Sequence, residues 1–235
     1  MQRYFAHIDQ NIVRLSSEDE HHVLHVMRMR VGDKIEVVDN STLYICEIKN
    51  ISPLEIIIIE QKEEDVEINT KTTLFFALAK GDKIDLVLQK ATELGVHRII
   101  LFKSKRCVVN FDNKDFEKKV VRYQKIVKEA AEQCHRLIVP SIEGVIELKD
   151  IDKYLSEVNF VAYEKEAGST TNSFNLSKDI KSVSIMIGSE GGFDEDEISF
   201  LKEKGFQTVS LGKRILRCET AAIYALSVLA YKLEK

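Results

Sequence analysis

The first 68 residues alternate short apolar runs with polar turns. Ile-rich segments at 45–52 and 54–61 are typical of strands, and residues 34–48 predict a hairpin that turns at Asp39-Asn40-Ser41. One helix is predicted in this region, with Ser16 or Ser17 as its N-cap and Gly32-Asp33 at its end. Together these elements predict a small barrel of short strands.

A different pattern begins near residue 72, after an acidic connector at 61–72. Continuous apolar runs predict strands that are covered on both faces, at 72–79, 96–102, 158–164, 182–188 and 207–211. Apolar residues at helical spacing predict intervening helices at 80–95, 115–134, 194–204 and 219–233. Such alternation favours an α/β fold with a mainly parallel sheet. We therefore expect two domains, residues 1–68 and 72–235.

Composition narrows the class of protein. Apolar residues make up 44% of the chain and charged residues 31%, which favours a packed globular protein. The sequence predicts neither a membrane span nor a secretory signal, and the four dispersed cysteines are typical of a reducing cytoplasm. His21, His22 and His25 lack an evident carboxylate or cysteine partner, so we expect no metal site.

Charge is distributed unevenly along the chain. The net charge is −4 for all 235 residues. Residues 1–68 contain 7 basic and 14 acidic side chains, whereas residues 80–136 contain 14 basic and 8 acidic ones. A basic middle segment can bind a polyanion even when the whole chain is acidic.

Glycine is concentrated near the carboxyl end of the chain. Five of the ten glycines fall between Gly188 and Gly212, in segments that follow two predicted neighbouring strands. Ligands bind at the carboxyl ends of strands in open α/β sheets, and glycine lets the backbone approach them closely. Neither a GxxxxGK[ST] nor a GxGxxG motif is present. We expect a pocket for a flat polar ligand such as a nucleoside, although tight turns alone would also explain single glycines.

The segments IGSEGGFDEDEI, from 187, and LGKRILRCETAAIYAL, from 211, resemble the signature segments of the RsmE family. The segments MQRYFAHI, HHVLHVMRMRVGDKIEVVD, KGDKIDLVLQKATELGVHRII and KIVKEAAEQCHRLIVP resemble the same family in the same order. Members are methyltransferases of the SPOUT superfamily that methylate N3 of a uridine in 16S ribosomal RNA. The family usually has proline where this chain has Ser189, which puts the rigidity of that turn in doubt.

The resemblance implies a PUA-like β-barrel domain that helps to bind RNA, and a SPOUT domain with a trefoil knot. It also implies a homodimer that uses S-adenosyl-L-methionine and acts on 16S ribosomal RNA or the small ribosomal subunit. The candidates for the cofactor pocket are Tyr163, Ile187, Gly188, Gly191, Gly192, Leu211, Gly212, Ile215, Leu216, Thr220 and Ala221. Tyr163 and the neighbouring Glu164 are candidates for a third wall of that pocket. For Leu211, Ile215 and Leu216, simple core packing is the alternative.

The reaction needs a nucleophilic N3, which carries a proton at neutral pH. Either a base removes that proton or a cation stabilises the uracil anion. Arginine keeps its proton, so Arg136 and Arg217 are candidates for holding the RNA and the uracil. Glu219 or Glu190 is the candidate base or orienting group, although a carboxylate at Glu219 would also suit the first turn of a helix.

Binding to RNA phosphates requires positive charge. The candidate cations come from four segments: Arg28, Arg30, Lys80, Lys83, Lys103, Lys105, Arg106 and Arg122. The KSKR segment at 103–106 is the strongest of these because it follows a predicted strand. A solvated basic face is the alternative for each of them.

Two other functions fit the same sequence. One is methylation of another RNA position, such as a ribose 2′-hydroxyl. The other is a non-catalytic RNA-binding factor in ribosome assembly, against which the intact segment at 211–221 argues, since a binder needs no cofactor pocket.

Overall fold

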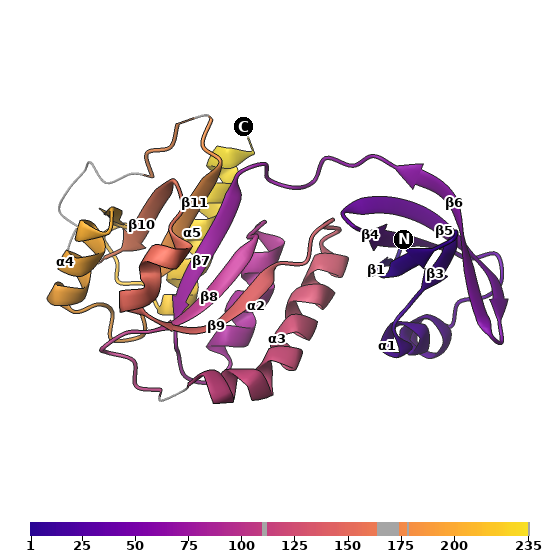
Figure 1. The fold of residues 1–235 in the computed structure, drawn as a ribbon, viewed down its shortest axis with the longest axis horizontal. Helices are drawn as coiled ribbons and strands as arrows, with labels where there is room; N and C mark the ends of the chain where they lie inside the picture. The colour runs from indigo at the N-terminus through magenta and orange to yellow at the C-terminus, as the bar shows by residue number, and fades with distance from the viewer. Residues whose placement is uncertain (110–111, 164–173, 178, 235) are drawn as a thin grey trace. The chain divides into compact units, whose positions relative to one another are not determined.

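The computed structural model describes residues 1–109, 112–163, 174–177 and 179–234. The chain forms two compact units (Figure 1). The first consists of residues 1–67 with 131–138, and the second of residues 68–130 with 139–235. The sequence prediction had assigned 131–138 to the second domain, because nothing in its pattern separates these residues from the preceding helix.

The first unit is built on a mixed six-stranded sheet with the strand order β1-β4-β5-β6-β3-β2. Its strands are β1 (Arg3–Phe5), β2 (His7–Asp9), β3 (Ile12–Arg14), β4 (Lys34–Asp39), β5 (Thr42–Ile51) and β6 (Leu54–Lys62). Only β1 and β4 run parallel among the described pairs. The predicted hairpin is confirmed: Asn40 and Ser41 both have positive φ, at 48° and 62°, as a two-residue turn between twisted strands requires.

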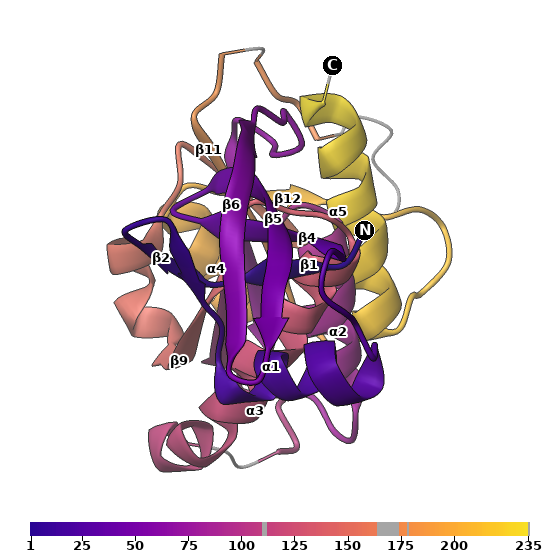
Figure 2. The ribbon, with the colours of Figure 1, turned by 90° about the vertical axis from the view of Figure 1, so that its right-hand side faces the viewer.

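The helix of the first unit is shorter than the sequence predicted, because it ends before Gly32. Helix α1 spans Ser17–His21, and the Ser16 hydroxyl accepts a 3.1 Å hydrogen bond from the Asp19 amide at its start. It continues as the π-helix η1 (His22–Val26), whose Val23 is fully buried together with strand residues of this unit. Figure 2 shows α1 and the strands of the first unit. Arg28 then has a φ of +52°, which ends the helix before Gly32 because a right-handed helix cannot include it.

Segment 131–138 is bound to the first unit by buried charge. The Arg3 side chain is fully buried and forms 2.8 Å ion pairs with both Glu36 and Glu64. The same guanidinium donates a 2.6 Å hydrogen bond to the His135 carbonyl. A buried arginine is tolerated only with such partners, so these contacts explain why the segment belongs to this unit.

The second unit contains a six-stranded sheet in which every described pair is parallel. The strand order is β12-β10-β11-β7-β8-β9. The strands are β7 (Lys71–Ala77), β8 (Arg98–Lys103), β9 (Ser141–Glu147), β10 (Val158–Ala162), β11 (Ser182–Ile187) and β12 (Phe206–Val209). The parallel α/β prediction is confirmed, but β9 was missed because only Ile146 of its side chains is buried.

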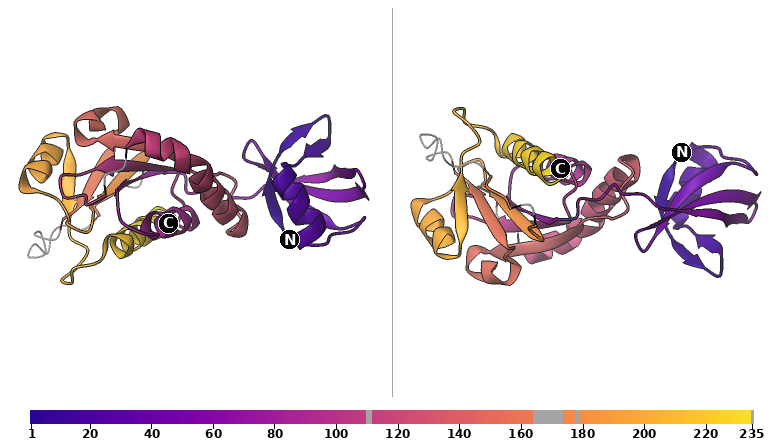
Figure 3. Two further views of the ribbon diagram at one scale, coloured as in Figure 1. Left: turned by 90° about the horizontal axis from the view of Figure 1, so that it is seen from below. Right: turned by 90° about the horizontal axis from the view of Figure 1, so that it is seen from above.

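Helices cover both faces of this sheet (Figure 3). They are α2 (Lys83–Glu93), α3 (Asn113–Gln133), the 3₁₀ helix η2 (Leu148–Tyr154), α4 (Glu195–Glu203) and α5 (Cys218–Leu233). Alternate strand residues face opposite sides: Phe76 packs in the cluster with α2, α3 and α5, and Phe75 in the cluster with α4 and η2. Among the described residues, no helix is long and apolar enough to cross a membrane.

The acidic run after residue 193 starts helix α4. The Asp194 side chain accepts a hydrogen bond from the Asp196 amide, and the Glu197 carboxylate accepts a 2.9 Å bond from the Asp194 amide. This reciprocal arrangement satisfies amides that the helix itself leaves without partners. The helix therefore begins at its predicted position.

Candidate functional site

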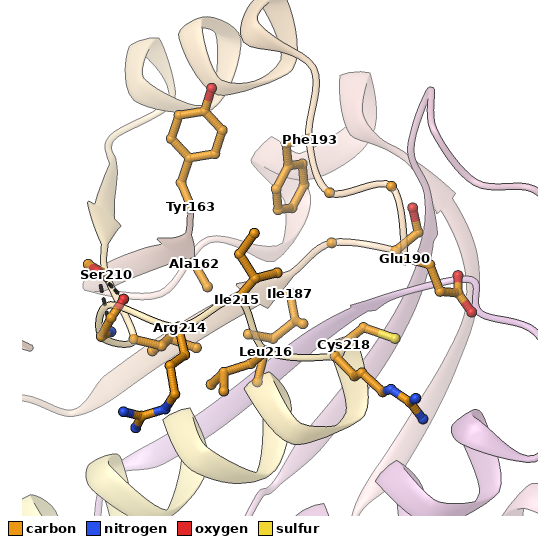
Figure 4. A pocket seen from close by; sticks show the side chains of 18 of the residues that line it. Ala162, Tyr163, Ile187, Glu190, Phe193, Ser210, Arg214, Ile215, Leu216 and Cys218 are labelled. Carbon is orange, nitrogen blue, oxygen red and sulfur yellow. Dashed lines mark hydrogen bonds between the residues drawn. The ribbon is translucent and has the colours of Figure 1, made fainter. Parts of the chain in front are cut away.

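A cavity of about 590 Å³ lies at the carboxyl ends of β10, β11 and β12 (Figure 4). Its size suits a nucleoside-sized ligand. The lining comes from three chain segments and two single residues: 162–163, 187–193, 210–218, Ala221 and Lys83. Eleven of the residues that the sequence suggested for a cofactor lie among the described residues, and ten of them line this cavity; the described lining does not include Thr220.

The sequence suggested that the two glycine-rich loops follow neighbouring strands, and this was wrong. Strand β10 lies between β11 and β12 and pairs with both in parallel. Its end contributes Ala162 and Tyr163 to the cavity, so the segment considered as a third wall lies between the other two. Glu164, proposed with Tyr163, lies outside the described residues.

The loop after β11 is closed by contacts of its own and by a neighbouring segment. The Gly192 amide donates a 2.9 Å hydrogen bond to the Ser189 carbonyl, and Gly192 has a φ of +65°. A Cβ atom on Gly191 would lie 2.9 Å from the Arg106 Cβ and 3.2 Å from the Arg106 carbonyl oxygen. The Arg106 guanidinium also donates a 3.2 Å hydrogen bond to the Gly191 carbonyl. Glycine is therefore required at 191 because the protein packs closely there. The sequence had suggested a different reason, that glycine lets the backbone approach a ligand.

Ser189 contributes a buried hydroxyl to this loop. The residue is 5% exposed, and its Oγ is the one buried side-chain polar atom without a hydrogen-bond partner among the described residues. Leaving such a group without a partner costs about 1–3 kcal/mol. The residue at which this chain departs from the resembled family is thus also a point of local instability.

The loop after β12 is much more open. Gly212 has a φ of +111°, and nothing lies within 4 Å of the position where its Cβ would be. Ser210 Oγ accepts a 3.3 Å hydrogen bond from the Gly212 amide, the contact that shapes the start of the loop. Ile215 is 88% exposed, whereas Leu211 and Leu216 pack partly against the core. Core packing and cavity lining therefore both hold for these two leucines.

A lysine links two carboxylates at the edge of the cavity. Lys83 Nζ lies 2.8 Å from Glu190 and 3.8 Å from Glu219. Its hydrogen bond to Glu190 raises the pKa of Lys83 above its ordinary value. The sequence assigned Lys83 to RNA binding, but its charge is engaged within the site.

Both carboxylates are ionised at neutral pH. Burial opposes ionisation of Glu190, but hydrogen bonds from Lys83 and from backbone amides hold its pKa below the ordinary value. Burial also opposes ionisation of Glu219, and there a backbone amide, the Cys218 thiol and the nearby charges of Lys83 and Arg217 lower the pKa. Glu190 and Lys83 line the cavity, whereas its described lining does not include Glu219, which follows the lining residue Cys218. Two negative charges and one bridging positive charge therefore lie in the lining or next to it.

The Cys218 thiol is a group that the sequence analysis did not single out. It donates a 3.3 Å hydrogen bond to the Glu219 carboxylate. Burial, reinforced by that hydrogen bond, raises the pKa of Cys218 to about 12, so the thiol stays protonated. The thiol therefore acts as a neutral donor that orients Glu219. In the sequence, the one feature that could have indicated this role is that Cys218 stands next to the candidate carboxylate Glu219.

Arg136 has a structural partner elsewhere. It is 4% exposed, belongs to the first unit, and forms a 2.7 Å ion pair with Glu67. The Glu67 carboxylate also accepts hydrogen bonds from the Leu137 and Ile138 amides at 2.8 and 3.1 Å. The described lining of the cavity does not include Arg136, so its contact with uracil stays a prediction. Arg217, by contrast, lines the cavity.

Several cations proposed for RNA binding are neutralised by neighbours. Lys105 lies 3.1 Å from Asp196 and 3.5 Å from Asp194, and Arg106 lies 3.6 Å from Asp194. Arg122 pairs with Asp85. For Lys80 the recorded contact is made by the backbone amide, which donates to Glu190, so its ammonium group stays a candidate for RNA binding. Arg28 and Arg30 are on the first unit, and Lys103 lines a second, smaller hollow at the ends of β8 and β9. The KSKR segment therefore braces the loop after β11.

The histidines of the first unit have other contacts. His22 Nδ1 lies 2.9 Å from the Tyr4 hydroxyl, and the rings of His21 and His25 are 4.7 Å apart. The described residues contain no group of three or more His, Cys, Asp or Glu side chains arranged to hold a metal ion.

Two family models match the chain. The RNA methyltransferase domain matches residues 66–230, and the RNA methyltransferase PUA domain matches residues 15–61. Ribosomal RNA small subunit methyltransferase E of Bacillus subtilis is 36% identical over the whole of this chain and 98% of that protein. The protein of the same name from Buchnera aphidicola subsp. Schizaphis graminum is 35% identical over 98% of this chain and 94% of its own.

A solved structure agrees with these relatives. Ribosomal RNA small subunit methyltransferase E from Neisseria gonorrhoeae, bound to S-adenosyl methionine, superposes with a TM-score of 0.87 at 29% identity. The likeness covers 99% of this chain and 98% of that one. With a PUA-like mixed sheet followed by an all-parallel sheet, the chain belongs to the ribosomal RNA small subunit methyltransferase E family, the RsmE family of RNA methyltransferases.

Proposed function

We propose that the chain transfers the methyl group of S-adenosyl-L-methionine to N3 of one uridine in 16S ribosomal RNA, in the cytoplasm. The observation that carries the proposal is the cavity of about 590 Å³ at the carboxyl ends of β10, β11 and β12. A relative with the same fold has S-adenosyl methionine bound. The small ribosomal subunit is the expected partner, because the relatives are named for it.

The residues of the cavity fit this cofactor. Ile187, Leu211 and Leu216 offer apolar surface for an adenine ring, and the main chain of 188–192 offers donors and acceptors for its edge. The cofactor, when bound, supplies a methyl group on a positively charged sulfur. The Glu190 carboxylate in the lining, and the Glu219 carboxylate next to it, favour that charge.

Glu219 is the stronger candidate for taking the N3 proton. Glu190 is tied to Lys83 at 2.8 Å and to the Lys80 amide at 3.1 Å, whereas Glu219 is 3.8 Å from Lys83. A carboxylate that is less tightly paired is more available to a new donor. Glu190 then holds Lys83 in place, and Arg217 stabilises the oxygen edge of the uracil anion.

A homodimer and a trefoil knot belong to the same proposal. The last helix, α5, exposes Tyr224 and Tyr231, which are 48% and 65% accessible. Such side chains suit an interface between copies. Sedimentation at micromolar concentration tests this: a mass of two chains supports the dimer, and a single chain throughout contradicts it.

The activity is tested with 16S ribosomal RNA or small subunits from cells that lack the enzyme. Labelled methyl transfer followed by mass mapping should locate the methyl on N3 of a uridine. A methyl group on a ribose or on another base would contradict the proposed position and favour the alternative function, methylation of another RNA position. Binding of RNA without measurable binding of S-adenosyl-L-methionine by calorimetry would favour the non-catalytic assembly factor.

A further inference from the structure

The basic residues near the cavity fall into two groups. Lys83, Lys105 and Arg106 are already in ion pairs with carboxylates. A phosphate must displace those carboxylates before it gains the cation, so the net stabilisation is small. These side chains were predicted to bind RNA, and their pairing makes them poor phosphate ligands.

Lys213 and Arg214 form the second group. Both are exposed and both line the cavity, in the open loop after β12. Among the described residues, neither makes a hydrogen bond or an ion pair. Figure 4 shows the Arg214 side chain on the opposite side of the cavity from Glu190. Their charge is therefore available to a ligand that approaches the mouth of the cavity.

The open loop carries positive charge with little local compensation. Arg217 follows at the base of the loop, and the nearest acidic residue in sequence, Glu219, is already linked to Lys83 and Cys218. A polyanion is the favourable occupant of a loop with exposed cations that no described carboxylate pairs with.

Resting on the proposed function, we propose that Lys213 and Arg214 bind the RNA phosphates that flank the target uridine. The N3 edge of a uridine is hidden in a duplex, so the base has to leave its stack to reach the cavity. Two cations at the cavity mouth stabilise the strongly bent backbone that this requires. They are positioning residues, which touch the RNA and not the reacting atoms.

The test measures the salt dependence of RNA binding, because it responds to phosphate contacts. Filter binding of in vitro transcribed 16S ribosomal RNA between 50 and 200 mM salt is compared for the wild type and Lys213→Ala/Arg214→Ala. Each lost phosphate contact lowers the slope of log K against log salt by about 0.7–0.9, so the double variant should lose about 1.4–1.8. Lys213→Arg/Arg214→Lys should restore most of the slope.

Lys105→Ala/Arg122→Ala is the matched control, since it removes two cations that are already paired with carboxylates and should change the slope by less than half as much. Equal slopes for the wild type and Lys213→Ala/Arg214→Ala would overturn the proposal. If the slopes are equal and the sedimentation of the double variant is altered, the loop belongs to an interface between copies instead. Calorimetry with S-adenosyl-L-methionine separates failure of the proposed function from failure of this assignment. If the wild type does not bind the cofactor, the proposed function is contradicted. If the wild type binds the cofactor and the slopes are equal, only the assignment of Lys213 and Arg214 is contradicted.

Discussion

The two loops that line the cavity differ in how they are held. The loop at 188–193 is closed by a tight turn, by the Arg106 contact and by Phe193, which is 1% exposed. The loop at 210–217 has open space around Gly212 and an almost fully exposed Ile215. One wall is therefore formed before any ligand binds, and the other has contacts still to make. A preformed wall fixes orientation, while an open wall can close over cofactor and RNA.

The largest expected effect separates the two carboxylates that Lys83 links. Glu190 lies in the closed loop, and Glu219 follows the open one. Glu219→Gln should lower kcat for methyl transfer by about 10²–10⁴-fold, the range for loss of a general base. Glu190→Gln should cost less than about tenfold, because it only releases Lys83. Single-turnover rates measure both, and the reverse ranking would assign the base to the closed loop.

Gly191→Ala tests whether the closed wall is preformed by packing. The new Cβ would lie 2.9 Å from the Arg106 Cβ, so the loop has to shift. Overpacking costs about 1–3 kcal/mol, which corresponds to about 5- to 150-fold weaker binding of S-adenosyl-L-methionine if all of it falls on binding. Calorimetry measures the change.

Gly205→Ala is the control for this substitution, since Gly205 has a φ of +86°, which strains a side chain, but no atom lies within 4 Å of the added Cβ. It should lower stability without changing cofactor affinity. Arg106→Gly combined with Gly191→Ala should recover part of the lost affinity, because it removes the Cβ atom that the new methyl group meets. Wild-type affinity in Gly191→Ala alone would show that the Arg106 contact does not shape the cavity.

The pH dependence of stability sharpens the view of the Lys83 cluster. The folded pKa values of Glu190 and Glu219 lie below the ordinary 4.5, so the unfolded chain binds more protons in that range. Their contribution to stability is complete above pH 4.5 and is lost as the pH falls through the folded values. Urea unfolding from pH 7 to pH 3 should show a smaller acid loss for Glu190→Gln than for the wild type. An identical loss in both would contradict the pairing.

The smallest effect concerns the buried hydroxyl of the closed loop. Ser189→Ala removes a polar group that has no partner, so it should stabilise the chain by about 1 kcal/mol. Ser184→Ala is the matched control, because the Ser184 hydroxyl is fully buried and donates a 2.8 Å hydrogen bond to Asn159. That substitution should destabilise by about the same amount. Equal losses in the two variants, measured by urea unfolding, would mean that Ser189 has a partner.

The sequence was a good guide wherever local pattern decides structure. Buried parallel strands, the hairpin turn at Asn40 and Ser41 and the start of α4 at Asp194 follow from runs of apolar residues, turn formers and caps. Strand order does not, because it depends on which strands pair in space. The position of β10 between β11 and β12 therefore had to come from the structure.

Side-chain pairing was also beyond the reach of the sequence. A lysine in a basic segment looks the same whether it faces solvent, as Lys213 does, or two carboxylates, as Lys83 does. The burial of Arg136 with Glu67 joins residues 69 positions apart, which no local period records. Ten of the residues suggested for the cofactor do line one cavity, since glycine and apolar residues at strand ends are close along the chain as well as in space. That they bind the cofactor stays a prediction.

Hydrogen exchange with and without S-adenosyl-L-methionine tests the central claim most directly. Amides in 187–193 and 210–217 should both exchange more slowly with the cofactor. The larger change should fall in 210–217, because that wall is open before the ligand binds. Unchanged exchange in both loops at saturating cofactor, or protection confined to other segments, would contradict the account.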